Sequence, residues 1–261
     1  MSKDKPFYIF KSKYFWRINM REALLLLVAG FGGFIGSLMS GGSLITLFIL
    51  TLFEIPTKTA IGTLKMVIAV LTLVSSLTYL KAGILNLKMA FTVVFFSLIG
   101  SYVGSAFLLS MSEETANFIV MAFLLIGTYF VLKEPQGEPV FSGKLAQSIV
   151  GLAIGIYIGV LGIESTLVVI SLLRMFFRLD ILRANAMAKA IIFFNNLVAF
   201  ITYAESGSVD YSIGLLLMFP VIIGSWLGAK TALKMDSKHL KGMFIGISLL
   251  TLANLLRNLI D

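Results

Sequence analysis

The sequence of 261 residues contains no cysteine, one histidine and five prolines, and only 13% of its residues are charged. Without cysteine the chain forms no disulfides and offers no thiolate for metal or redox chemistry. The single histidine, His239, stands in a charged loop and supports no histidine-based acid-base set. We therefore expect no cofactor, no metal site and no catalytic residue, and the sequence does not favour an enzyme.

Apolar residues, in contrast, make up 58% of the chain, and its mean hydropathy is +0.98. A soluble chain of this length could not bury that much apolar surface. Helices of about 20 apolar residues, however, match a bilayer core roughly 30 Å thick. The composition predicts an all-α integral membrane protein with one membrane domain, crossing the cytoplasmic membrane several times.

The formal net charge of +8 is spread over loops and an N-terminal tail. Because the basic residues form no single face, we expect no nucleic-acid partner. Residues 1–22 interleave basic and aromatic side chains, a pattern typical of a segment that lies on the membrane surface against anionic lipid. Membrane lipids are therefore the expected partners of this segment, whereas the oligomeric state is not indicated.

An internal duplication organises the rest of the chain, because residues 60–111 recur at 184–235, displaced by 124 positions. The copies share polar and glycine landmarks within apolar helices: Lys65 with Lys189, Tyr79 with Tyr203, Gly83 with Gly207, Gly100 with Gly224, and Gly104 with Gly228. Repeated hydrophobic halves are typical of secondary transporters, which build one central site between them.

Charged residues and Gly/Pro breaks divide the chain into ten apolar segments, five in each half. We expect them at 22–40, 43–54, 60–81, 88–110 and 115–133, then at 144–163, 165–177, 184–205, 209–233 and 239–259. The second segment of each half, about 18 Å long, is too short to cross alone, so it should form a broken or re-entrant pair with the segment before it.

Each half then crosses the membrane an odd number of times, which predicts two inverted repeats. The first transmembrane repeat spans residues 23–133 and the second spans residues 144–261. Residues 134–143 form the linker, which begins in the stretch that holds two closely spaced prolines.

Each half also has a glycine-rich or polar break before its second segment. The breaks are Gly41-Gly42-Ser43 and Glu164-Ser165-Thr166. A helix that restarts there exposes backbone N–H groups at the positive end of its dipole, which binds anions. Gly41, Gly42, Ser43, Ser165 and Thr166 are therefore candidate anion ligands. The alternative role for glycine in membrane helices is close packing, which we expect for Gly100, Gly104, Gly224 and Gly228.

Two lysines, Lys65 and Lys189, occupy the same position in the two copies of an apolar helix. Because seven residues make nearly two helical turns, each lysine starts a polar stripe: Lys65, Thr72 and Tyr79 in the first half, and Lys189, Asn196 and Tyr203 in the second. A lysine facing lipid costs about 3 kcal/mol, so we expect both to face the interior as a paired cationic site. Alternatively, each lysine extends to the headgroups from roughly 8 Å inside its helix.

Further polar residues complete the candidate site. Thr63, Thr72, Asn195 and Asn196 offer hydroxyl and amide donors to anionic oxygens, although hydrogen bonding between helices is the usual role of Asn in membranes. Glu164 stands where the first half has Gly41. It can pair with one of the two lysines, or take up and release a proton during transport, and both roles stay open.

These residues resemble the TauE/SafE family of sulfite and organosulfonate exporters from residue 23 to residue 259. The likeness rests on the glycine-rich break and on short stretches of each half: Ala60-Ile61-Gly62-Thr63, Gly83-Ile84-Leu85-Asn86 and Gly100-Ser101-Tyr102-Val103-Gly104, then Gly159-Val160-Leu161-Gly162, Gly207-Ser208-Val209-Asp210 and Gly224-Ser225-Trp226-Leu227-Gly228. The chain departs from the family pattern at Glu164-Ser165 and at Asn185-Ala186-Met187.

The resemblance implies a secondary transporter that exports a small sulfur-containing anion such as sulfite, sulfoacetate or a related organosulfonate. The residues themselves predict a small anion held near the membrane centre, with one half rocking against the other in alternating access. Two alternatives stay open. One is an anion channel or permease for another small oxyanion, and the other is a helical scaffold whose polar stripes only join helices.

Overall fold

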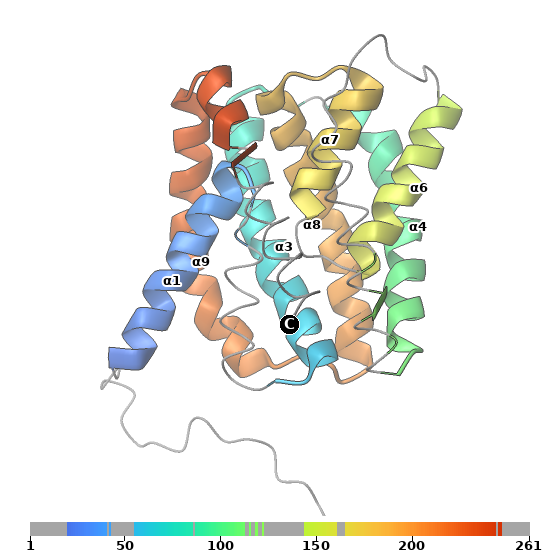
Figure 1. Ribbon diagram of the computed structural model, residues 1–261, viewed down its shortest axis with the longest axis vertical. Helices are drawn as coiled ribbons and strands as arrows, with labels where there is room; N and C mark the ends of the chain where they lie inside the picture. Colours follow the sequence, from blue (N-terminus) through green and yellow to red (C-terminus); the bar gives the residue numbers. More distant parts are fainter. Residues whose placement is uncertain are drawn as a thin grey trace, which may run out of the picture.

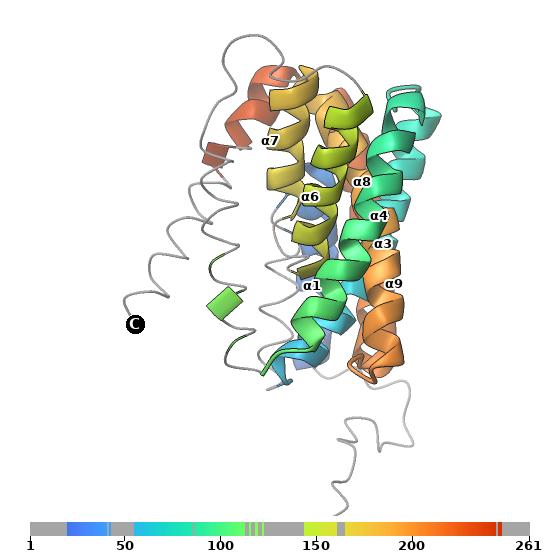
Figure 2. The same cartoon turned by 90° about the vertical axis from the view of Figure 1, so that its right-hand side faces the viewer.

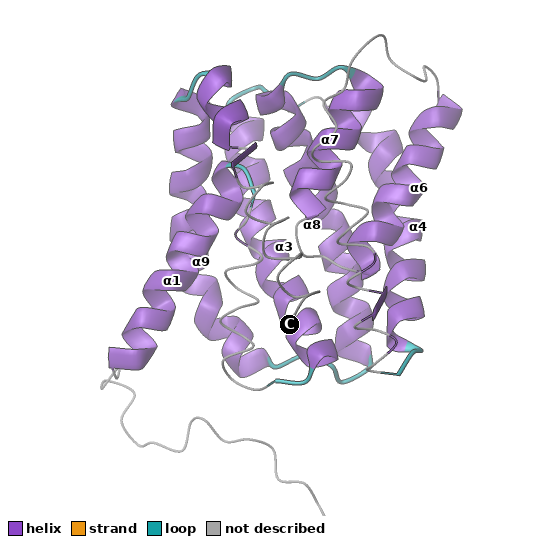
Figure 3. Ribbon diagram, in the orientation of Figure 1, coloured by secondary structure: helices purple, strands orange, loops and turns teal. Residues whose placement is uncertain are grey.

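The computed structural model describes residues 20–40, 42, 55–85, 87–112, 144–160 and 165–243, together with residues 115, 118, 119, 122, 245 and 246. These residues are helical between turns and contain no strand (Figure 3). The main helices are α1 (Met20–Leu38), α3 (Thr57–Lys81), α4 (Leu87–Leu109), α6 (Lys144–Val160), α7 (Ser165–Phe177), α8 (Ile181–Glu205) and α9 (Tyr211–Lys234).

The predicted helix boundaries agree closely with this structure. Helix α7 matches the predicted segment 165–177, and the other six helices begin and end within three residues of their predicted bounds. The predicted segments 43–54, 115–133 and 239–259 lie wholly or largely outside the described residues, as do the linker and all but the last three residues of the N-terminal segment.

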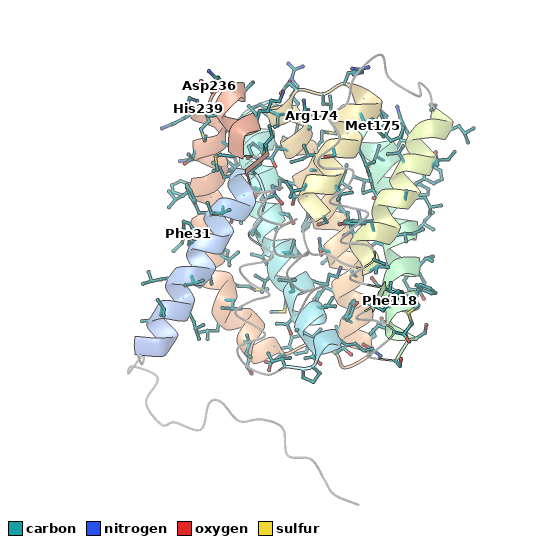
Figure 4. All side chains as sticks on the ribbon, in the orientation of Figure 1. Phe31, Phe118, Arg174, Met175, Asp236 and His239 are labelled. Carbon is teal, nitrogen blue, oxygen red and sulfur yellow. The ribbon has the colours of Figure 1, made fainter. Side chains whose placement is uncertain are left out.

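Four of these helices, α3, α4, α8 and α9, are long and apolar enough to cross a membrane, and α1, α6 and α7 are shorter apolar helices. The described loops lie mostly at the two ends of the bundle (Figure 3). Arg174, Asp236 and His239 lie at one of these ends, whereas Phe31 points outward from the side of the bundle (Figure 4). The chain is an all-α integral membrane protein, as its composition predicts.

Helices α3 and α8 contact each other and are the more buried of the four long helices. The most extensive contacts join α1 to α9 and α4 to α6. Figure 2 shows α6 lying between α4 and α7. In the internal duplication, α1 corresponds to α6 and α4 corresponds to α9. The contacting pair α1 and α9 is therefore the counterpart of the contacting pair α6 and α4, and we call these two pairs the outer helix pairs.

The counterparts also differ in direction. In Figure 1, α1, α3 and α9 run upward and α4, α6 and α8 run downward. The inverted repeat itself stays a prediction from the sequence, and these directions agree with it.

Glycines bring the backbones of the outer helix pairs into contact. A Cβ atom added at Gly224 of α9 would lie 2.9 Å from the backbone nitrogen of Phe34 in α1, and closer still to the Gly30 oxygen. At Gly100 of α4, a Cβ atom would lie 2.8 Å from the backbone nitrogen of Ile156 in α6. Gly104 and Gly228 make equivalent approaches to Ile156 and Phe34. The predicted packing role of these four glycines is confirmed.

Helices α3 and α8 end in the same way. Gly83 and Gly207 have φ angles of 70° and 71°, in the left-handed region that glycine adopts without a steric penalty. At each end the glycine N–H and the next N–H bond back to the last turn, at Leu80 O and Tyr79 O after α3. Ala204 O and Tyr203 O accept the corresponding bonds after α8. This is the Schellman cap, and it occurs in both copies of the repeat.

We expect Gly83→Ala and Gly207→Ala each to lower the free energy of unfolding by about 1 kcal/mol, because an L-residue is strained in the left-handed conformation. Thermal unfolding of the purified protein in detergent measures the effect, with an expected shift of about 3 °C each. Gly242→Ala is the control, since a Cβ atom there meets nothing within 4 Å and φ is not positive. An equal loss of stability in all three variants would contradict this account of the caps.

Candidate functional site

The two predicted lysines are buried completely, with an exposed fraction of 0% for both Lys65 and Lys189. Each ammonium reaches across to the other half of the chain. Lys189 Nζ on α8 donates to Gly36 O at 2.5 Å and to Met39 O at 3.0 Å, at the end of α1. Lys65 Nζ on α3 donates to Ile158 O near the end of α6. Both lysines therefore face the interior as predicted, and neither extends to the headgroups.

The end of α1 is held by side chains from α3 and α8. The last carbonyl groups of a helix have no partner within it and form the negative end of its dipole. Besides the two carbonyls bound by Lys189, Ser37 O accepts from Tyr79 Oη at 3.1 Å and Leu38 O accepts from Asn185 Nδ2 at 3.0 Å. Four successive carbonyl groups thus find donors on two neighbouring helices.

Lys189 also lies beside the start of α7. Its Nζ is 3.4 Å from Thr166 Oγ1, in the first turn of that helix, and Ser165 next to Thr166 is buried. Gly42 lies against Gly36 of α1. The structure therefore brings Gly42, Thr166 and Lys189 together between the negative end of α1 and the positive end of α7. Gly41, Ser43 and Glu164 lie outside the described residues.

Within the part of the chain that the structure describes, Lys65 has fewer hydrogen-bond partners than its ammonium group can bind. Among the described residues, Ile158 O is the only hydrogen-bond acceptor for Lys65 Nζ, and no acidic side chain forms a salt bridge with it. An ammonium group has three N–H donors, and a buried charge without compensation is costly. Two of the three N–H donors of Lys65 therefore have no acceptor among the described residues.

The remaining predicted residues are separate from this contact network. Thr63 Oγ1 accepts from the backbone N–H of Asp210 at 2.8 Å, at the start of α9. Thr72 Oγ1 donates to Ile68 O at 2.6 Å within its own helix. The amide nitrogens of Asn195 and Asn196 donate to Ile191 O at 2.7 Å and Ile192 O at 2.9 Å, one turn earlier in α8. A ligand-binding role for these four residues stays a prediction.

A cluster that the sequence reasoning missed lies around Asn195. Asn195 Nδ2 also donates to Ser97 Oγ of α4 at 2.7 Å, and Ser101 Oγ donates to Asn195 O at 2.9 Å. Ser97 and Ser101 are one helical turn apart, a spacing that places both hydroxyls on the same face of α4. Within the described part of the chain, the Oδ1 atoms of Asn195 and Asn196 have no hydrogen-bond partner. Amide oxygens accept hydrogen bonds, so these two atoms suit a donor and not the oxygen of an anion.

Asn185 was also missed as part of the site. Besides Leu38 O, its Nδ2 contacts Tyr79 Oη at 3.1 Å. The signal was present in the sequence, because Asn185 precedes Lys189 by four residues and therefore lies on the same face of α8.

The structure has this region closed to water. Lys65, Lys189, Asn185, Asn195 and Asn196 all have an exposed fraction of 0%. A dissolved anion can contact them only after helices move, and a site that opens by motion is what alternating access requires.

Comparison with known proteins gives the family. The family described as "Sulfite exporter TauE/SafE" matches residues 25–255. A probable membrane transporter protein of Haemophilus influenzae is 27% identical over 240 residues, covering 89% of this chain and 93% of the relative. One from Methanocaldococcus jannaschii is 30% identical over 244 residues, covering 85% of this chain and 91% of the relative. No solved structure matches the chain. Because the match extends over nearly the whole sequence, this chain belongs to the TauE/SafE family and is a multi-pass membrane transporter of the cytoplasmic membrane.

Proposed function

We propose that the protein is a secondary transporter that exports a small sulfur-containing oxyanion, such as sulfite, sulfoacetate or a related organosulfonate. The observation that carries this proposal is the pair of fully buried lysines, one in each half, each placed at the end of a helix from the other half. The family description names sulfite exporters, which supports the sulfur oxyanion.

Electrostatics favours an anion over a neutral or cationic solute. Two ammonium groups in a membrane interior are costly unless negative charge compensates them. Lys65 has N–H groups to offer, whereas Lys189 contributes its charge while it holds α1 and lies beside the N-terminus of α7. A small oxyanion supplies both the compensating charge and several acceptors for these donors.

The closed site supports alternating access as the mechanism. In this proposal the buried lysines face one side of the membrane and then the other, and the anion travels with them. Glu164, which lies outside the described residues, is the candidate for a coupled proton because it is the acidic residue of the predicted helix break.

Flux measurements in proteoliposomes test this proposal. Radiolabelled sulfite flux should saturate and should be accelerated by unlabelled sulfite on the opposite side, and sulfoacetate and thiosulfate should compete with it. Taurine should compete weakly because two lysines repel its ammonium group. Unitary currents without acceleration by counterflow would favour the anion channel. Absence of flux for every anion of the panel would refute sulfur-oxyanion transport.

A further inference from the structure

Three neutral oxygen atoms lie near the Lys189 ammonium, two at the C-terminal end of α1 and one in the first turn of α7. Gly36 O lies 2.5 Å, Met39 O 3.0 Å and Thr166 Oγ1 3.4 Å from Nζ. We refer to these three oxygens as the α1 cage. Backbone carbonyl and hydroxyl oxygens are ligands that hard cations bind, and the negative end of the α1 dipole favours positive charge at the same place.

Asn185 adds a further oxygen to this region. Its Nδ2 donates to Leu38 O and to Tyr79 Oη, and its Oδ1 is buried without a hydrogen-bond partner among the described residues. This oxygen shares its amide group with the nitrogen that is 3.0 Å from Leu38 O, so it lies near the end of α1. Several oxygen atoms that accept hydrogen bonds therefore lie near this helix end, as expected of a cation site.

The α1 cage lies at a helix end, which is where some secondary transporters bind a coupling ion. In secondary transporters built from broken helices, the C-terminal ends of half-helices and unwound carbonyl groups coordinate the coupling Na⁺ ion. In this protein such a helix end binds an ammonium group that is covalently attached to α8.

We propose that the α1 cage is a monovalent-cation site that the Lys189 ammonium fills, so that the protein carries its own cation and needs no Na⁺ from solution. Lys65 repeats the arrangement in the other half, with its ammonium on Ile158 O near the end of α6. Shortening Lys189 leaves the buried carbonyl oxygens of Gly36 and Met39 without this donor, and a small cation from solution then takes its place.

Thermal unfolding of Lys189→Ala in detergent tests the site without any transport measurement. Sodium, ammonium and choline chlorides are compared at equal ionic strength. We expect Na⁺ or ammonium to raise the unfolding temperature of the variant by on the order of 5 °C relative to choline, in a saturable way. Lys189→Gln is the matched control, because its amide N–H offers a donor to part of the cage and should make the cation dependence smaller than in Lys189→Ala. Equal stability of Lys189→Ala in the three salts would overturn the proposal.

The wild-type protein provides a test that does not depend on a variant folding. Its unfolding temperature should be the same in the three salts, and saturable stabilisation by Na⁺ would overturn the proposal.

A transport measurement, which alone rests on the proposed function, should give sulfite flux within about twofold when choline replaces Na⁺. Flux that requires Na⁺ refutes the filled cage but not transport. Cation-dependent stability of Lys189→Ala without sulfite flux refutes the transport proposal but not the cage.

Discussion

Lys65→Gln is expected to reduce sulfite flux in proteoliposomes by about 10- to 100-fold. A hydrogen bond to a charged group contributes about 1.5–3 kcal/mol, and each 1.4 kcal/mol is a factor of ten in affinity. Glutamine removes the charge and keeps an N–H donor for Ile158 O, the single described acceptor of Lys65. The fold should therefore survive while anion binding is lost, as thermal unfolding of the same preparation would show.

Lys189→Gln should reduce flux to a similar extent and also lower stability. This lysine contacts Gly36 O, Met39 O and Thr166 Oγ1, and one amide group cannot replace all of these contacts. The control is Lys81→Gln, an exposed lysine in the last turn of α3, which should leave flux within about twofold of the wild type. Wild-type flux in both Lys65→Gln and Lys189→Gln would refute the paired cationic site.

Gly224→Ala is expected to give the largest loss of stability. Alanine gains up to about 1 kcal/mol in helix propensity over glycine. Its methyl group, however, meets the backbone of α1 at Gly30 and Phe34, and overpacking costs about 1–3 kcal/mol or more. Backbone atoms cannot move aside as side chains do, so the clash should exceed the gain. We expect a fall in unfolding temperature on the order of 10 °C, together with a lower yield of monodisperse protein.

Gly155→Ala tests the other outer pair, because its methyl group would meet the backbone of Ser97 in α4. The two substitutions affect different helix pairs, so their effects should add in the double variant. Gly246→Ala is the control, since a Cβ atom there meets nothing within 4 Å. If Gly224→Ala and Gly155→Ala unfold at the wild-type temperature, the backbones of these helix pairs are not in contact.

Local features of the fold could be predicted from the sequence. Helix α7 matches its predicted bounds because charged and polar residues interrupt the apolar sequence on both sides. The burial of the Lys65 and Lys189 stripes was also predictable. The helical period places the polar side chains of each stripe on one face, and a polar face of a membrane helix avoids lipid.

The partners of the site residues could not be predicted in the same way. Spacing along one helix does not say which other helix lies opposite, so the contacts of Lys189 and Asn185 with the end of α1 required the fold. Thr72 and Asn196 illustrate the same limit, because both side chains share a stripe with a lysine and yet bond to their own helices.

The outer helix pairs have a consequence for how the protein moves. Helix α1 belongs to the first half of the chain and packs backbone to backbone on α9 of the second, and α4 of the first half packs likewise on α6 of the second. Because the two halves are interlocked, we expect the boundary between moving bodies not to follow the chain, in contrast to the rocking of one half against the other that the sequence predicts. Cutting the polypeptide between residues 134 and 143 should therefore leave two fragments that remain associated, and neither fragment should assemble in the bilayer without the other.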